Sequence, residues 1–207
     1  MKRNKLFIGS RASKLALIYA NKVKNEISKH YNKEIIIKEI NTTGDNKIDI
    51  RLSELGGKGL FSKNIENELL NKNIDLAVHA LKDLPSFDTE GLVTNCFLKR
   101  NNSNEVMISN SNKKLNDLVP GSIVGTSSFR REFQLKRIRK DLNFKLIRGN
   151  VDTRIRKLKS GEYDAIILAK AGLSSLNLDK EITQEFSNND LIPSAGQGTI
   201  AVQCRNC

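Results

Sequence analysis

Arginines recur beside the ends of apolar runs in this chain. They are Arg11, Arg130, Arg131, Arg148 and Arg154. A guanidinium group is a planar fork that binds a carboxylate through two parallel hydrogen bonds. Any one of these residues could be an ordinary surface arginine. Several of them at loop positions predict a ligand that carries several carboxylates or phosphates.

Two segments where a strand should give way to a helix share glycine, hydroxyl and arginine residues. They are 9–13 (Gly-Ser-Arg-Ala-Ser) and 125–131 (Gly-Thr-Ser-Ser-Phe-Arg-Arg). The first turn of a helix has free N–H groups and the positive end of the dipole, so it attracts anions. Ser13 and Ser128 could also be plain helix caps, the commoner use of a single serine there. Because ligands of open α/β sheets bind at the carboxyl ends of strands, the two segments together predict an anion-binding cleft between domains.

A further group of candidates lies in 78–85 (Val-His-Ala-Leu-Lys-Asp-Leu-Pro), at the end of an apolar run. Lys82 and Asp83 are therefore expected at the C-terminal end of a buried strand, where catalytic groups gather. Nearby cations keep a carboxylate ionised, and such a carboxylate can stabilise a cationic intermediate. The alternative is that Asp83 only begins a turn before Pro85. His79 is expected to be half-buried, with its hydrogen bonds satisfied.

Residues 55–61 (Leu-Gly-Gly-Lys-Gly-Leu-Phe) form a glycine-rich segment before an expected helix. The segment lacks the spacing of a phosphate-binding P-loop, and the chain has no Gly-x-Gly-x-x-Gly motif. A nucleotide site is therefore not expected. We interpret the segment as a mobile lid or as a place where the backbone closely approaches a ligand, with Lys58 reaching that ligand.

The cysteines form no recognisable site. Cys204 and Cys207 have the spacing of a CxxC motif, but no helix follows them to activate a thiolate. Zinc would need two further ligands, and only His30, His79 and Cys96 remain. We expect neither a metal site nor a redox function.

The overall composition narrows the choice of partner. The chain has 207 residues and a net charge of +12, which suits an anionic partner but also fits solvated lysines on helix surfaces. Aromatic residues make up 5% and are scattered, which argues against base stacking on a nucleic acid. No apolar run approaches the roughly 18–20 residues of a membrane span. The basic N-terminus lacks the apolar stretch of a signal peptide, and three cysteines fit a reducing compartment, so a cytoplasmic protein is expected.

Apolar runs alternate with helix-periodic segments along the chain. Strands are expected at 5–9, 35–40, 74–78, 92–98, 122–125, 143–147 and 165–169. Helices are expected at 13–28, 60–70, 128–139 and 153–159. The alternation predicts an α/β protein with mostly parallel strands. The polar segment 99–104 predicts a crossover between two domains.

Eight segments, taken together and in this order, resemble the porphobilinogen deaminase family, whose members are also called hydroxymethylbilane synthases. They are 9–17 (GSRASKLAL), 43–45 (TGD), 56–63 (GGKGLFSK), 75–85 (DLAVHALKDLP), 121–131 (GSIVGTSSFRR), 148–154 (RGNVDTR), 161–173 (GEYDAIILAKAGL) and 193–205 (PSAGQGTIAVQCR). Each segment is weak evidence by itself. Together they are specific and cover nearly the whole chain.

The resemblance implies an α/β fold with two domains of type 2 periplasmic-binding-protein architecture around a central cleft. The first domain would comprise 1–99 and 196–207, and the second 100–195. The family's third domain, whose Gly-Gly-Cys segment carries the cofactor, has no counterpart in 1–207. No cofactor-attachment cysteine is therefore expected in this chain.

The family joins four porphobilinogen molecules head to tail, loses ammonia at each step and primes on a dipyrromethane cofactor. The resemblance thus implies a cytoplasmic, monomeric transferase of porphyrin and haem biosynthesis, with no nucleic-acid or membrane partner. Two alternatives stay open: a non-catalytic two-domain binder of polycarboxylates, and one part of a split enzyme. A nucleic-acid binder is suggested only by the net charge and ranks behind both.

The matched positions also imply residue roles. Asp83 corresponds to the family's catalytic aspartate. The positions that correspond to substrate and cofactor binding are Arg11, Ser13, Lys58, Lys82, Thr126, Ser128, Arg130, Arg131, Arg148 and Arg154. The chain departs from the family pattern at Tyr19 (usually Gln), Ala80 (usually Ser), and Asn104 and Ser175 (both usually Arg). Two of the arginines expected to pair with carboxylates are therefore missing.

Overall fold

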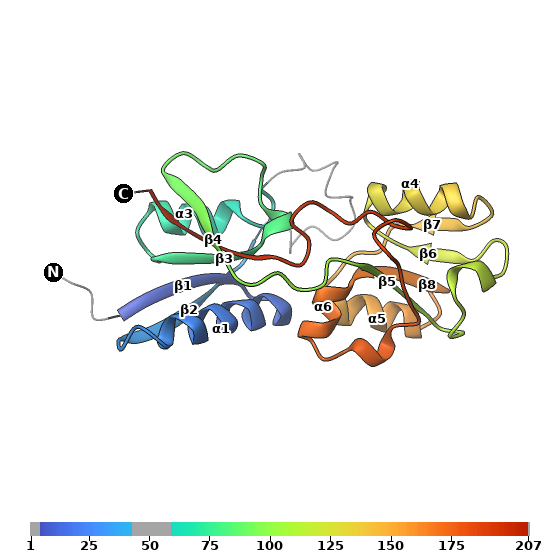
Figure 1. Ribbon diagram of the computed structural model, residues 1–207, viewed down its shortest axis with the longest axis horizontal. Coiled ribbons are helices and arrows are strands. Elements are labelled where there is room, and N and C mark those ends of the chain that lie inside the picture. The colour runs from blue at the N-terminus through green and yellow to red at the C-terminus, as the bar shows by residue number, and fades with distance from the viewer. Residues whose placement is uncertain (1–4, 43–58, 207) are drawn as a thin grey trace. The chain divides into compact units, whose positions relative to one another are not determined.

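A computed structural model describes residues 5–42 and 59–206 (Figure 1). These residues form two compact units. The first unit holds the described chain up to Asn101 and again from Gly196, and the second unit is Asn102–Ala195. Within the described residues, the chain therefore leaves the first unit once and returns to it. Within the described ranges, no helix is both long enough and apolar enough to cross a membrane.

The first unit is built on a five-stranded sheet. Its strands are β1 (Lys5–Arg11), β2 (Glu34–Ile40), β3 (Leu76–Ala80), β4 (Leu92–Phe97) and β10 (Ile200–Arg205). They lie in the order β2-β1-β3-β10-β4. β1 is parallel to β2 and β3, whereas β10 is antiparallel to β3 and β4. The returning segment is thus inserted between two strands of the first unit.

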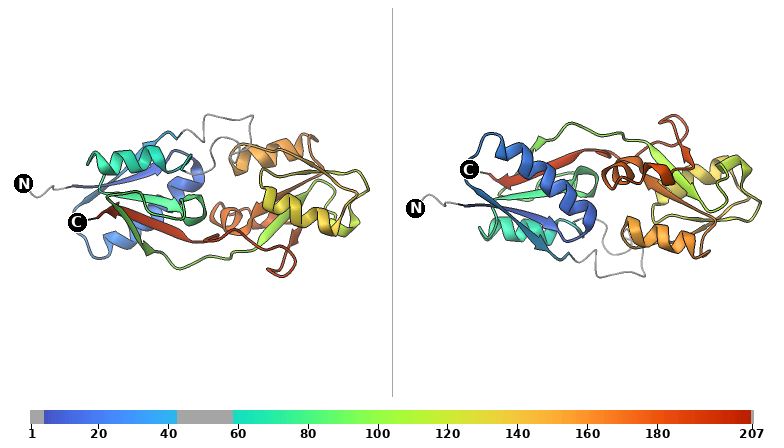
Figure 2. Two further views of the ribbon diagram at one scale, coloured as in Figure 1. Left: turned by 90° about the horizontal axis from the view of Figure 1, so that it is seen from above. Right: turned by 90° about the horizontal axis from the view of Figure 1, so that it is seen from below.

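Helices α1 (Lys14–Ser28) and α3 (Lys63–Leu70) cover the two faces of this sheet (Figure 2). Successive residues of β3 point to opposite faces, so that Val78 joins the core under α1 and Ala77 joins the core under α3. Because both faces of the central strand β3 are covered, β3 is a largely apolar run rather than an alternating one. β3 continues directly into the short helix η2 (Leu81–Asp83).

The second unit repeats this design. Its strands are β5 (Glu105–Ser109), β6 (Ile123–Gly125), β7 (Asn143–Lys145), β8 (Ala165–Ala169) and β9 (Gln184–Glu185). They lie in the order β7-β6-β8-β5-β9. β6 is parallel to β7 and β8, and β5 is antiparallel to β8 and β9.

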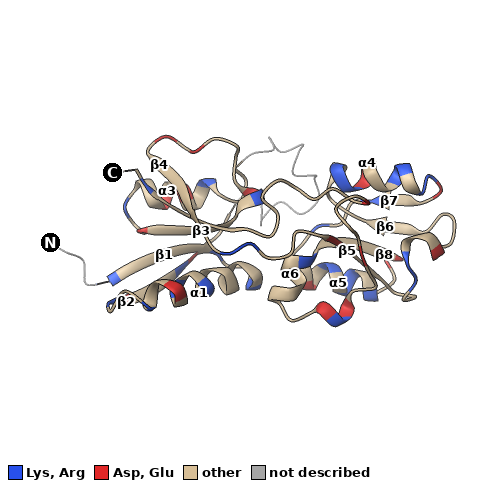
Figure 3. Ribbon diagram, in the orientation of Figure 1, with Lys and Arg blue, Asp and Glu red and all other residues tan. Residues whose placement is uncertain are grey.

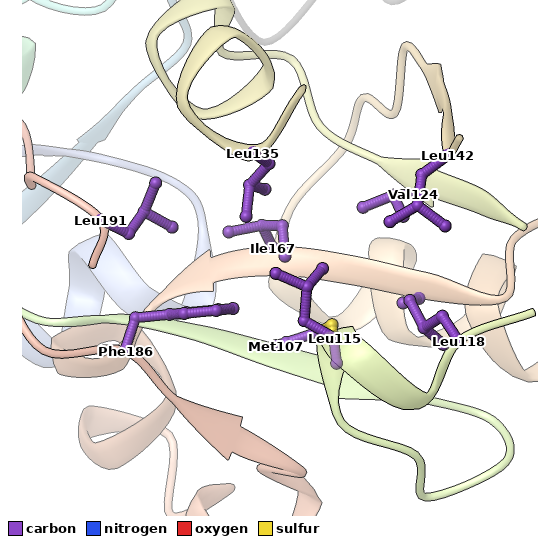
Figure 4. Packing of buried hydrophobic residues seen from close by; sticks show 10 residues of the cluster. Met107, Leu115, Leu118, Val124, Leu135, Leu142, Ile167, Phe186 and Leu191 are labelled. Atoms are coloured by element: carbon purple, nitrogen blue, oxygen red, sulfur yellow. The ribbon is translucent and has the colours of Figure 1, made fainter. Parts of the chain in front are cut away.

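Helices again cover both faces of the second sheet. They are α4 (Phe129–Ile138), α5 (Val151–Lys159) and α6 (Lys170–Ser175), with the short helices η3 (Leu115–Asp117) and η4 (Asp179–Glu181) beside them. Leu135 of α4 packs with Met107 and Ile167 in one core (Figure 4). Leu158 of α5 packs with Ile166 in the other core. Neighbouring residues of β8 therefore serve different cores.

The predicted α/β class is confirmed, but the prediction of mostly parallel strands is wrong. Each sheet has two parallel and two antiparallel pairings. β10 joins the first sheet only after the chain has passed through the second unit, and β5 is the first strand of the second unit, directly after the crossover. A pattern of alternating elements does not reveal the direction of either strand. The sequence analysis also missed β5 altogether, and it began α3 at residue 60 rather than at Lys63.

Candidate functional site

The candidate residues of the first unit gather at one edge of its sheet. Because β1, β2 and β3 are parallel, their carboxyl ends share this edge. β10 runs the other way, and Ile200 pairs with Ala80, so β10 begins at the same edge. The residues after β1 and β3 and those before β10 are therefore neighbours, although the sequence separates them widely.

Arg11 and Ser13 occupy the junction between β1 and α1. Arg11 is the last residue of β1, and its guanidinium carbon lies 4.0 Å from the ring centroid of Phe61. The Ser13 hydroxyl caps α1 by accepting a hydrogen bond from the Ala16 N–H at 3.4 Å. Ser13 is thus a helix cap, and its hydroxyl proton can still be donated to a ligand.

Lys82 and Asp83 form the single turn of η2 directly after β3. The turn is held by the segment before β10: the Leu81 N–H donates to the Thr199 carbonyl at 3.0 Å, and Lys82 Nζ donates to Gln197 Oε1 at 3.4 Å. The Gln197 side chain is only 1% exposed. Asp83 is half-buried, and its carboxylate makes no hydrogen bond or ion pair within residues 5–42 and 59–206. A carboxylate of this kind is available for a ligand.

His79 precedes this turn and is more enclosed than expected. It is 6% exposed, and its Nε2 atom has no hydrogen-bond partner in the described part of the chain. Burial lowers the pKa of His79 to about 4; the charge of Arg11 lowers it further, and the amide of Gln203 works in the opposite direction. The prediction of a half-buried, satisfied histidine is therefore wrong, and the ring is neutral at pH 7.

The second unit carries its candidates at the equivalent edge of its own sheet. Thr126 and Ser128 lie between β6 and α4, where the Thr126 hydroxyl accepts from the Ser128 N–H at 3.2 Å. The Ser128 hydroxyl in turn caps α4 by accepting from the Arg131 N–H at 3.4 Å. Gly125 has no room for a side chain, because a Cβ atom there would lie 2.8 Å from the Tyr163 ring. The start of α4 is thus closely fitted to the sheet.

Arg130 and Arg131, in the first turn of α4, both bind the carboxylate of Glu105. Arg130 Nη2 lies 2.5 Å from Glu105 Oε1, and Arg131 Nη2 lies 2.7 Å from Oε2. The Glu105 side chain is fully buried. Burial favours a higher pKa for Glu105, but the charges and hydrogen bonds of Arg131 and Arg130 outweigh it and hold the pKa below its usual value. Sequence reasoning missed Glu105; its signal was an acid directly before four apolar or small residues, which make the rest of β5.

Arg148 and Arg154 flank the junction between β7 and α5. Arg148 is buried, and Arg154 Nε donates to the Gly149 carbonyl at 2.8 Å. Gly149 has a φ of +107°, and a Cβ atom there would lie 2.7 Å from Thr153 Cγ2. Lys and Arg residues are prominent along α4 and α5 (Figure 3). The second unit therefore concentrates guanidinium groups at the carboxyl ends of β6 and β7.

The remaining residues singled out in the sequence that the structure describes are not part of the groups at the two sheet edges. Lys58 lies outside the described residues. Asn104 donates to Glu185 Oε1 at 2.7 Å. Cys96 and Cys204 are free thiols. Over the described residues, no group of three or more His, Cys, Asp or Glu side chains is placed to hold a metal ion.

Comparison with known families identifies one match that spans almost the whole chain. The family model described as porphobilinogen deaminase, dipyromethane cofactor binding domain, matches residues 6–207. The porphobilinogen deaminase of Bacillus pumilus (strain SAFR-032) is 49% identical over 202 residues, which is 96% of this chain and 64% of the relative. That of Geobacillus kaustophilus (strain HTA426) is 47% identical over 204 residues, or 97% and 65% of the two chains. The chain thus spans about two thirds of the length of these relatives.

Solved structures of low sequence identity share this fold. The effector binding domain of BenM with benzoate has a TM-score of 0.58 at 14% identity and covers 98% of this chain and 84% of its own. A Bacillus subtilis protein described as a putative methionine-binding lipoprotein has a TM-score of 0.56 at 13% identity, with 98% and 84% covered. An ancestral cationic amino acid solute binding protein has a TM-score of 0.59 at 11% identity, with 100% and 84% covered. These likenesses confirm the predicted two-domain, periplasmic-binding-protein-like fold.

Proposed function

Because the chain belongs to the porphobilinogen deaminase family, we propose that it supplies binding and catalytic groups for the condensation of porphobilinogen into hydroxymethylbilane. In this reaction four substrate molecules are joined head to tail, and each loses ammonia. The product is the linear tetrapyrrole that leads to porphyrins and haem. The observation that carries the proposal is the half-buried carboxylate of Asp83, which makes no hydrogen bond or ion pair within the described residues and lies at the sheet edge that also holds Arg11 and Lys82.

The arginines and hydroxyl groups suit the negative charge of this substrate. Porphobilinogen carries an acetate and a propionate, so the growing product gains two carboxylates with each unit. Guanidinium groups bind such carboxylates in a fixed plane, whereas lysine acts as a point charge. The residues proposed to bind them are Arg11, Ser13, Lys58, Lys82, Thr126, Ser128, Arg130, Arg131, Arg148 and Arg154.

Asp83 is proposed to act on the reacting pyrrole. The C–N bond of the substrate's protonated aminomethyl group breaks, ammonia leaves with the bonding electrons, and the pyrrole nitrogen supplies the pair that replaces them. The methylene-pyrrolenine that results is a cation with an acidic N–H. The Asp83 carboxylate accepts a hydrogen bond from that N–H and stabilises the positive charge. Asp83 is also proposed to accept the proton that the attacking pyrrole carbon loses once the new C–C bond has formed.

The same chemistry fits a dipyrromethane cofactor, whose two rings carry acetate and propionate groups. The start of α4 offers a donor set for such groups, and the buried Nε atom of Arg131 has no hydrogen-bond partner in the described chain. We propose that Arg130, Arg131 and Ser128 hold carboxylates of the cofactor. When bound, the cofactor supplies the pyrrole carbon to which the first substrate unit is joined.

We further propose that the protein is a cytoplasmic monomer that acts without nucleic acid. The free thiols of Cys96 and Cys204 support a reducing compartment. Gel filtration with light scattering would test the monomer, and a dimer would overturn it.

The experiment that tests the function measures ammonia release and, after oxidation, uroporphyrin from porphobilinogen. We would assay the chain alone and together with the separately produced C-terminal third of the Bacillus pumilus relative. Ammonia release in either assay is the expected result. Calorimetric binding of porphobilinogen without ammonia release would favour the alternative, a non-catalytic binder of polycarboxylates. The absence of both porphobilinogen binding and ammonia release would overturn the proposal.

A further inference from the structure

Glu105 is a fully buried carboxylate that no step of the proposed reaction uses. It is the first residue of β5, and it pairs in the sheet with Ala169 at the end of β8. Because β5 is antiparallel to β8, Glu105 lies at the edge where the parallel strands end and α4 begins. A charged side chain with 0% exposure is unusual for any protein and calls for an explanation.

Both oxygens of Glu105 are committed to guanidinium groups. Oε1 accepts from Arg130 Nη2 at 2.5 Å, and Oε2 accepts from Arg131 Nη2 at 2.7 Å. The Arg131 side chain is 9% exposed and the Arg130 side chain 30% exposed. One arginine is therefore enclosed with Glu105, while its neighbour reaches the surface.

Backbone carbonyl groups hold the same two guanidinium groups from other directions. Arg131 Nη1 donates to the Ile167 carbonyl of β8 at 3.1 Å, and Arg130 Nη1 donates to the Ile192 carbonyl. Gln134 fixes the Ile192 segment, because its Oε1 accepts from the Ile192 N–H at 2.9 Å and its Nε2 donates to the Ile192 carbonyl. Hydrogen bonds to Glu105 on one side and to backbone carbonyl groups on the other fix the orientation of both guanidinium planes.

Stability alone does not explain this arrangement. The cost of removing a carboxylate and an arginine from water largely cancels their attraction, so that apolar residues of similar volume often stabilise a fold as well or better. What the buried acid adds is orientation and charge balance. Two guanidinium groups and one carboxylate leave a single net positive charge at the start of α4.

We propose that Glu105 is a positioning residue, which holds Arg130 and Arg131 in the orientation that receives one carboxylate of the pyrrole ligand. This inference rests on the proposed function for the identity of the ligand, but the holding of the two arginines can be tested without it. Arg130 is the more exposed of the pair and presents its remaining N–H groups to the ligand. Arg131, anchored by Glu105 and Ile167, sets the position of that first helical turn.

The test compares Glu105→Gln, which removes the charge, with Glu105→Asp, which keeps it on a shorter side chain. Asp141→Asn is the matched control, since Asp141 pairs with Arg139 at the other end of α4 at 2.5 Å. Hydrogen exchange of the arginine Nε–H groups is followed by NMR. We expect exchange at Arg131 to become roughly tenfold or more faster in Glu105→Gln, because a buried charge has lost its partner. Glu105→Asp should recover part of the protection, and the control should leave it unchanged.

Porphobilinogen titration of the same proteins gives the second readout. We expect Glu105→Gln to weaken binding or raise the KM by roughly tenfold, since a displaced binding group costs about this much or more, with a smaller effect for Glu105→Asp. Unchanged exchange at Arg131, or faster exchange with unchanged affinity, would overturn the inference. Wild-type protein that does not bind porphobilinogen would count against the proposed function, and the exchange data would then decide the positioning role alone. If Glu105→Gln does not fold, the Glu105→Asp variant decides both readouts.

Discussion

The guanidinium group of Arg11 lies over the ring of Phe61, with its central carbon 4.0 Å from the ring centroid. Arg11 ends β1, whereas Phe61 lies in the turn before α3. The ring face attracts the cation and fixes the plane of the guanidinium group. The N–H groups of the guanidinium point outward within its own plane, where they can donate hydrogen bonds. Phe61 therefore orients an arginine that the proposed function requires for carboxylate binding.

Replacing this ring should weaken ligand binding more than folding. In Phe61→Leu we expect the loss of about 0.5–1 kcal/mol of cation–π attraction, together with a several-fold weaker affinity for porphobilinogen. Calorimetry and urea unfolding measure the two effects. Phe87→Leu is the control, because Phe87 is 83% exposed in the same unit. Equal affinities in the two variants would contradict an orienting role for Phe61.

Asp83 should be dispensable for folding and essential for turnover. Its carboxylate has no hydrogen bond or ion pair in the described chain, so we expect Asp83→Asn to change the free energy of unfolding by about 0.5 kcal/mol or less. Ammonia release should fall by roughly 10²–10³-fold, since the cation loses its fixed negative charge. The assay is ammonia release under saturating porphobilinogen.

The control for this variant is Asp88→Asn, a nearby exposed carboxylate that accepts a hydrogen bond from the Thr94 N–H at 3.4 Å. It should keep wild-type turnover. Loss of activity in both variants would point to a general charge effect rather than to a role for Asp83.

The capping role of Ser13 and Ser128 could be expected from the sequence, because a helix cap depends on residues that are close together in the chain. Each serine caps the helix that begins directly after it, and Arg11 lies at the sheet edge because it is the last residue of β1. The position of η2, which carries Asp83, depends on the contacts of Lys82 with Gln197 and of Leu81 with Thr199, and both partners follow a long excursion through the second unit. No periodicity within 78–85 reveals these partners.

The surroundings of Glu105 and His79 could not be predicted from the sequence pattern. Both are polar residues within apolar strands, and whether such a residue is satisfied depends on partners from other elements. For Glu105 the partners are Arg130 and Arg131 on α4, and for His79 the surroundings include Gln203 of β10. Burial and pairing of this kind are tertiary properties, so the composition of β3 or β5 alone could not supply them.

Gly149 should tolerate no side chain. Its φ of +107° is strained for any other residue, and the added Cβ atom would lie 2.7 Å from Thr153 Cγ2. We expect Gly149→Ala to lower the free energy of unfolding by about 2–3 kcal/mol. Gly161→Ala is the matched control: its φ is +82°, but nothing lies within 4 Å of the new atom, so the cost should be only about 1 kcal/mol. Urea unfolding followed by circular dichroism measures the free energy of unfolding of both variants. Equal losses would show that Thr153 can move away from the new Cβ atom at no energetic cost.

The buried imidazole of His79 should make stability depend on pH. Burial, with a smaller contribution from Arg11, depresses the pKa of His79 from 6.5 to about 4 in the folded chain. Between these two values the unfolded chain carries a proton on His79 that the folded chain does not. Stability therefore rises with pH across this window, and acidification from pH 7 to pH 4 favours unfolding. A difference of this size corresponds to about 3 kcal/mol.

Urea unfolding at steps between pH 7 and pH 4 measures this dependence, and two variants assign it. His79→Gln removes the titrating group and should flatten the profile between pH 6.5 and pH 4. His30→Gln removes the other histidine, which is exposed, and should leave the profile as in the wild type. Acidic side chains also contribute to the pH dependence near pH 4 in all three proteins. The contribution of His79 is therefore taken from the difference between the two variants rather than from the absolute slope. Parallel stability profiles for His79→Gln and His30→Gln would mean that His79 takes up its proton as easily in the folded chain as in the unfolded chain. That result would contradict the lowered pKa of His79.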